Sequence, residues 1–157
     1  MAPQAAVELA YRKVVGERVY IPDNLYVIGT MNVADRSLAL VDLALRRRFA
    51  FVDLEPRLGP SWRAWCVARG LRAPLLDEIA ARIHALNSEI SAASSLGPQF
   101  RVGHSFVMPD EDEQVPDGPV WFRARVETEI GPLLDEYWYD APEVARAART
   151  RLLASLD

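Results

Sequence analysis

The segment IGTMNVADRS (28–37), continued by LALVDLALRRRF (38–49), decides the fold class of this chain. The overlapping run LYVIGTM (25–31) is apolar and rich in β-branched and aromatic residues, which predicts a buried strand of the parallel kind. The residues after the polar turn are apolar nearly all round, as in a helix packed on several sides. FAFVDL (49–54) predicts a second strand. Strand, helix and strand within about 30 residues indicate a βαβ unit.

One βαβ unit is too small to stand alone, because both faces of a parallel sheet need to be covered. We therefore expect residues 1–56 to be a fragment of an α/β domain whose other strands lie N-terminal to Met1. A helix is also expected over residues 1–18. Residues 57–157 are expected to form a separate all-helical domain.

The second half of the sequence has clear helical periodicity. Apolar residues recur at steps of three and four over residues 75–92, which predicts an amphipathic helix. Helices are also expected over residues 119–139, with an interruption near Gly131, and over residues 142–156. No internal repeat is visible.

A shorter helix is expected between a cap at Ser61 and a stop at Gly70. Its lone cysteine, Cys66, lies on an apparent helix face and is expected to be a core thiol. A single cysteine also excludes an intramolecular disulfide framework. The acidic segment 109–118 is expected to be a solvated surface loop without chemistry of its own.

Composition excludes several classes of protein. Half of the 157 residues are apolar, a quarter are charged and the net charge is −4. The acidic second half is a poor candidate for binding a nucleic-acid backbone. No apolar run reaches the ~18 residues of a membrane span, so we expect no membrane association and a cytoplasmic protein. The single lysine, Lys13, does not stand in a GxxxxGK[ST] phosphate loop.

Several motifs together resemble the AAA+ domain of the McrB family, the GTP-hydrolysing subunits of McrBC-type modification-dependent restriction systems. The motif pair MNVADRS and LRRRF carries the resemblance, which continues through the following segments: FVDLEP (51–56), LNSEIS (86–91), LGPQFRVGHSFV (96–107) and IGPLLDEYWYD (130–140). Val33 stands where the family usually has threonine. Asp53 and Glu55 only superficially echo the family's acidic pair, because they are not adjacent.

The resemblance implies the C-terminal βαβ part of a AAA+ P-loop NTPase core, followed by a helical lid. It also implies a motor subunit that hydrolyses GTP with Mg²⁺, both bound mainly by a part of the domain upstream of this chain. The expected partners are further copies in a homo-oligomeric ring, taken as a hexamer, a McrC-type endonuclease, and modified foreign DNA bound through an N-terminal domain. This chain alone is expected to be inactive.

Two other functions remain open. A AAA+ ATPase of the MoxR or midasin type would share the architecture but use ATP. A lid and sensor module without turnover would belong to a different class, that of non-catalytic proteins. Sequence upstream containing a GxxxxGK[ST] loop would favour an enzyme over that module.

Asn32 follows the expected strand, at the edge where open α/β sheets bind ligands. An amide there can donate to a γ-phosphate oxygen and accept from the attacking water without adding charge. The resemblance assigns it the role of sensor 1. Asp35 either caps the next helix or holds Arg36 through a charge-assisted hydrogen bond.

Three arginines end the expected helix, where cations also suit the helix dipole. Asp42 and Arg46 are four residues apart and can pair along the helix, so that Asp42 would support an interface. Arg47, and after it Arg48, would then project outward. By resemblance, this position supplies an arginine finger in trans to the neighbouring subunit's γ-phosphate.

In the expected lid, Arg101 and His104 are the candidates for contacting the phosphates or the base. The alternative is structural. Phe100, Val102 and Phe106 alternate as in a strand packed on the lid core, and His104 would then be a structural histidine. We expect no residue of this chain to bind a metal ion.

Overall fold

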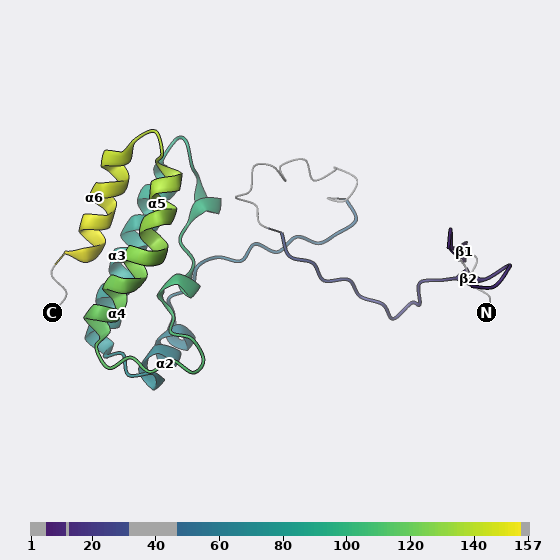
Figure 1. The fold of residues 1–157 in the computed structure, drawn as a ribbon, viewed down its shortest axis with the longest axis horizontal. Helices are drawn as coiled ribbons and strands as arrows, with labels where there is room; N and C mark the ends of the chain where they lie inside the picture. Colours follow the sequence, from purple (N-terminus) through teal and green to yellow (C-terminus); the bar gives the residue numbers. More distant parts are fainter. Residues whose placement is uncertain (1–5, 12, 32–46, 155–157) are drawn as a thin grey trace. The chain divides into compact units, whose positions relative to one another are not determined.

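The computed structural model describes residues 6–11, 13–31 and 47–154 (Figure 1). The chain divides into two compact units, residues 1–32 and 33–157. No helix within the described residues is long and apolar enough to cross a membrane.

The first unit contains a small antiparallel hairpin. Strand β1 (Val7–Glu8) pairs with β2 (Arg18–Val19), with Val7 opposite Val19. Gly16 has a φ of 82° between the two strands. The helix expected over residues 1–18 is therefore wrong for the described part of that range, since a left-handed glycine turns the chain back.

The two strands expected on either side of the polar turn are also not formed. Residues 25–31 and 49–54 are exposed and have no strand pairing. Tyr26 and Ile28 are 85% and 94% exposed. A central parallel strand is stable only with a neighbour on each edge and cover on both faces, and the described residues provide neither. The helix expected between these segments falls mostly outside the described residues.

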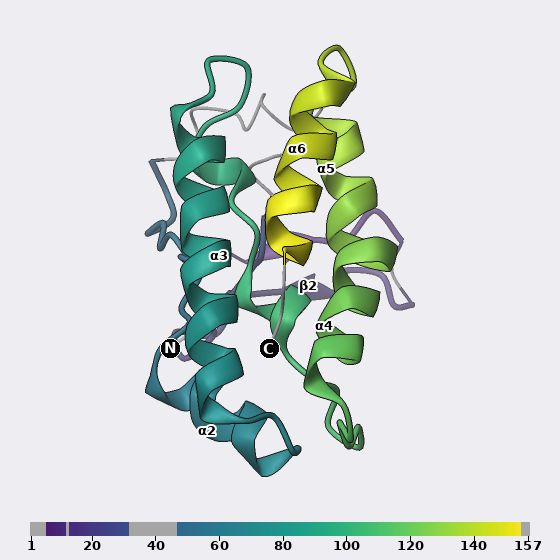
Figure 2. The same cartoon turned by 90° about the vertical axis from the view of Figure 1, so that its left-hand side faces the viewer.

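The second unit is a helical domain. Its helices are α2 (Pro60–Ala68), α3 (Ala73–Ala92), α4 (Gly118–Arg125), α5 (Gly131–Tyr137) and α6 (Pro142–Leu153). Helix α6 contacts both α3 and α5, and α2 contacts α3. Figure 2 shows α6 between α3 and α5.

The interruption expected near Gly131 takes the form of a π-helical turn, η4 (Val126–Ile130), between α4 and α5. Both views show α4, this turn and α5 as one helical column (Figures 1 and 2). A Cβ on Gly131 would lie 2.8 Å from the Val126 carbonyl oxygen and 2.8 Å from Nε of Arg149. Glycine at this position therefore lets the Arg149 side chain lie close against the column.

The helix predicted over residues 75–92 is confirmed as α3, which begins two residues earlier than expected. The cap expected at Ser61 is wrong, because Gly59 is the N-cap of α2 and Pro60 takes the first helical position. Gly70 does follow this helix, with a φ of 98°. Trp62 donates from Nε1 to the Val107 carbonyl over 2.8 Å, which ties α2 to the long connection after α3.

One apolar core fills this unit. Every helix from α2 to α6 contributes side chains that are fully buried or nearly so, among them Cys66, Ile79, Ile83, Phe122, Leu134 and Leu152. This shared core joins the helices α2 to α6 into one packed unit.

Candidate functional site

The site is built around residues 101–105, RVGHS, which we call the arm. It follows one 3₁₀ turn, η2 (Pro98–Phe100), and its last two residues begin a second, η3 (His104–Val107). The strand of the structural alternative is not formed, because glycine and proline break the alternation into short turns. Its packing was nevertheless foreseen, since Val102 is buried and both Phe100 and Phe106 pack against the core.

Asn87 of α3 fixes the arm. Its Nδ2 donates to the Val102 carbonyl over 3.0 Å, and its Oδ1 accepts from the Val102 N–H over 2.7 Å. Among the described residues, Asn87 is the only buried polar residue. A buried amide that satisfies both backbone groups of one residue specifies a single position for that residue.

The arm also holds residues 55–57, which we call the hinge segment. The half-buried Arg101 donates from Nε to the Pro98 carbonyl over 2.8 Å and pairs with Glu55 over 3.3 Å. Nδ1 of His104 accepts the Arg57 N–H over 3.4 Å. The structure thus brings Arg101 and His104 together on one loop, where both contact the segment that precedes the lid.

A polar pocket of about 250 Å³ opens beside these contacts. It is lined by Pro56, Leu58, His84, Asn87, Ser88, Ser91 and Arg101. The two serine hydroxyls donate within α3, to the carbonyls of His84 and Asn87, which leaves their oxygens free to accept. A guanidinium beside amide and hydroxyl groups suits a small polar or anionic ligand.

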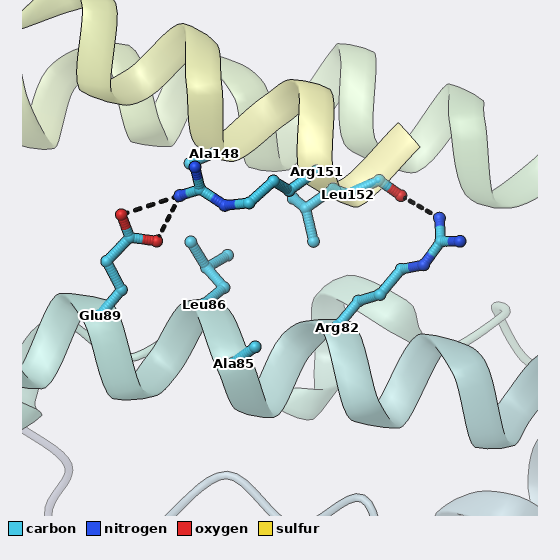
Figure 3. A pocket seen from close by; sticks show the side chains of 7 residues that line it. All are labelled: Arg82, Ala85, Leu86, Glu89, Ala148, Arg151 and Leu152. Carbon is cyan, nitrogen blue, oxygen red and sulfur yellow. Dashed lines mark hydrogen bonds and ion pairs between the residues drawn. The ribbon is translucent and has the colours of Figure 1, made fainter. Parts of the chain in front are cut away.

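A second pocket, of about 120 Å³, lies between α3 and α6 (Figure 3). Arg151 spans it to Glu89 at 2.5 Å, and Arg82 donates to the Leu152 carbonyl over 2.7 Å. Figure 3 shows Arg82 reaching from α3 to the Leu152 carbonyl of α6, and Glu89 reaching from α3 to the Arg151 guanidinium, which lies along α6. These contacts join α6 to α3, so this pocket is part of the packing rather than a candidate site.

The acidic segment 109–118 is more firmly held than its composition indicates. Arg69 stacks on Trp65, 3.3 Å from the ring centroid, and donates to the Asp110 and Glu111 carbonyls. The backbone oxygen of Arg69 accepts a hydrogen bond from the Val115 N–H over 2.8 Å. The expectation of a merely solvated loop is therefore wrong at its two ends.

Glu113 anchors the same loop to α4. It accepts a hydrogen bond from Trp121 Nε1 over 2.8 Å and pairs with Arg125 over 3.0 Å. Partial burial raises the pKa of Glu113, but hydrogen bonds from the Asp110 N–H, Trp121 and Arg125 outweigh that effect and leave the pKa below its usual value. Glu113 is thus held as a carboxylate, in a structural role.

Cys66 is confirmed as a core thiol. It is fully buried, and burial raises its pKa to about 11, against a smaller lowering by Arg69. A thiol in this state is a poor nucleophile. Within the described ranges there is no group of three or more His, Cys, Asp or Glu side chains arranged to hold a metal ion.

The residues expected near the γ-phosphate are only partly described. Asn32, Asp35, Arg36 and Asp42 lie outside the described residues, as does Arg46. Arg47 and Arg48 are described and exposed, in a turn. Their exposure leaves both side chains accessible, while their proposed role stays a prediction.

Sequence reasoning did not assign a role to Asn87 or Glu55. The burial of Asn87 could have been predicted from the sequence, because Asn87 stands four residues after Ile83 and three before Ile90, on the apolar stripe of α3. An amide on such a stripe must find a buried partner. Glu55 had no such signal, because its partner Arg101 is 46 residues away.

The sequence is similar to known proteins in two respects. Residues 74–146 match the family model described as "McrB, alpha-helical lid domain". The chain is also 42% identical over 151 residues to the "Type IV methyl-directed restriction enzyme EcoKMcrB subunit" of Escherichia coli (strain K12). That alignment covers 94% of this chain and 33% of the relative, so the chain spans about a third of the relative's length.

Proposed function

Because this chain belongs to the McrB family through its helical lid, we propose that it acts as the lid and adjoining core segment of a GTP-hydrolysing AAA+ motor subunit. The observation that carries the proposal is the 42% identity, which extends over 94% of the chain and so beyond the lid. The relative's description as a methyl-directed restriction enzyme supports a role against modified foreign DNA, such as phage DNA. In that setting the motor would drive a McrC-type nuclease.

In a complete subunit, residues 25–31 and 49–54 take their places as strands of the AAA+ core. Their exposed apolar side chains support this step, since Ile28 and Leu54 are 94% and 90% exposed. An apolar, β-branched segment left without partners marks a surface that another part of the protein covers. Residues 1–56 and 57–157 are then the core segment and the lid.

GTP with Mg²⁺ is bound mainly by the rest of the core, and this chain supplies groups around it. Asn32 positions the attacking water beside the γ-phosphate, while Asp35 and Arg36 hold its turn. From the lid, Arg101 and His104 face the nucleotide. The pocket beside Arg101 supports that orientation, because it joins a cation to hydrogen-bonding groups.

Arg47 acts in trans as an arginine finger, with Arg48 as the second choice and Asp42 supporting the interface. A finger in trans requires a head-to-tail contact that closes into a ring, for which we propose a hexamer. The exposure of both arginines supports this role. Such a finger contributes about 10³–10⁵ in rate.

The test uses a complete subunit that carries this chain. Asn32→Ala should abolish GTP turnover and leave GTP binding intact, whereas Asn24→Ala, in the exposed turn after Pro22, should change neither. Arg47→Ala should be inactive alone and regain turnover in rings mixed with a phosphate-loop mutant. Failure of that rescue would contradict a role in trans, and normal turnover in Asn32→Ala would contradict the sensor role.

A further inference from the structure

We propose that Asn87 is a positioning residue that sets the arm and, through the arm, clamps the hinge segment to the lid. The hinge segment 55–57 would then move with the lid as one body, and the flexible point of the chain would lie before Glu55. The clamp consists of contacts within this chain. Only its consequence for nucleotide depends on the proposed function.

The first step runs from α3 to the arm. Asn87 is 7% exposed and bonds both backbone groups of Val102, which is itself fully buried. Arg101 and Gly103 flank this fixed residue, and His104 follows. No other residue of the arm has both backbone groups bonded to one side chain within the described contacts. The position of the arm relative to α3 is therefore set at Val102.

The second step runs from the arm to the hinge segment. The two contacts come from opposite sides of Val102: Arg101 pairs with the Glu55 carboxylate, and His104 accepts from the Arg57 backbone. Two attachment points, one residue on each side of the anchor, prevent the segment from turning about a single contact. Pro56 lies between them and also lines the polar pocket.

The clamp would link movement of the lid to the segment that precedes it. A rotation of the lid would carry residues 55–57 with it, and the preceding residues 49–54 connect directly to Arg47 and Arg48. If Arg101 and His104 contact nucleotide, as proposed above, then closing the lid on it displaces the segment that leads to these arginines. Asn87 would thus couple the lid's nucleotide contacts to the subunit interface without contacting nucleotide.

The test measures amide hydrogen exchange in the complete 157-residue chain without nucleotide. Asn87→Asp keeps the acceptor for the Val102 N–H but replaces its donor to the Val102 carbonyl by an oxygen. We expect exchange to speed up at least tenfold at Val102 and several-fold at Arg57, with amides in the middle of α6 unchanged. Ser88→Ala, one residue along the same helix and exposed, is the matched control and should change none of them.

Uniform acceleration across α2 to α6 would show a general loss of stability and would overturn the proposal, as would an unchanged rate at Arg57. His104→Ala tests the second step without touching the core. It should speed exchange at Arg57 and leave Val102 protected, and no change at Arg57 would overturn the clamp even if Asn87→Asp fails to fold.

Failure of the proposed function is distinguished by a separate measurement. In a complete subunit, Asn87→Asp should raise the KM for GTP more than it lowers kcat. If exchange shows the clamp but the KM for GTP does not change, the proposed contact between lid and nucleotide is contradicted and the clamp is still supported.

Discussion

Replacing Gly70 by alanine should destabilise the helical unit strongly. Gly70 has a φ of 98°, where an L side chain costs about 1–2 kcal/mol. Its Cβ would also lie 2.8 Å from the Val115 carbonyl oxygen, a backbone atom. Moving that backbone weakens the hydrogen bond from the Val115 N–H to the Arg69 carbonyl, a contribution of about 1 kcal/mol. The free energy of unfolding should therefore fall by about 2–3 kcal/mol.

The assay is thermal unfolding followed by circular dichroism at 222 nm. For a domain of about 100 residues, this loss corresponds to a Tm lower by about 10 °C or more. Gly59→Ala is the matched control, since nothing lies within 4 Å of its added Cβ and its φ is −95°. It should change the free energy of unfolding by less than about 1 kcal/mol. Equal Tm values for the two variants would refute the reasoning.

Two further measurements probe single side chains. Since the folded state lowers the pKa of Glu113 below 4.5, its contribution to stability should be complete above that pH and be lost on further acidification. Glu113→Gln should accordingly lower the urea midpoint at pH 7 and lose that difference in acid, and an equal difference at every pH would contradict the carboxylate's role. Cys66, with a pKa of about 11 and no exposure, should react with iodoacetamide at pH 8 only at the rate of unfolding, and rapid labelling of the folded chain would contradict its burial.

The lid could be predicted from sequence because its signals are local. In α3 the steps of three and four between Leu75 and Ile90 fix both the helix and its buried face. The stop at Gly70 was also readable, because a helix end that needs a positive φ selects glycine. The interruption near Gly131 was foreseen as a break, but not as a π-helical turn that keeps the column continuous.

The α/β segment could not be assigned from local signals, because a strand is completed by its neighbours. Residues 25–31 have the composition of a buried strand, yet they are exposed and unpaired in this structure. The composition indicates that the segment would form a strand beside neighbouring strands, but it does not indicate whether those neighbours are present. The same limit applies to residues 49–54.

The contacts of the candidate site were the least predictable. Arg101 could be chosen from the resemblance, but its pairing with Glu55 joins residues 46 apart. Glu113 has the sequence context of one acid in a solvated loop, because its partners Trp121 and Arg125 stand 8 and 12 residues away, on α4. The burial of Asn87 was the one feature of the site that the sequence indicated, because an amide on the apolar stripe of a helix is expected to be buried and hydrogen-bonded.

Nucleotide preference tests the central claim most directly. Steady-state hydrolysis of GTP and of ATP should be measured on a complete subunit carrying this chain, under the same magnesium concentration. Faster turnover of GTP is expected. Faster turnover of ATP would contradict it and would favour an ATP-using AAA+ protein, while turnover of neither nucleotide would leave a non-catalytic lid and sensor module.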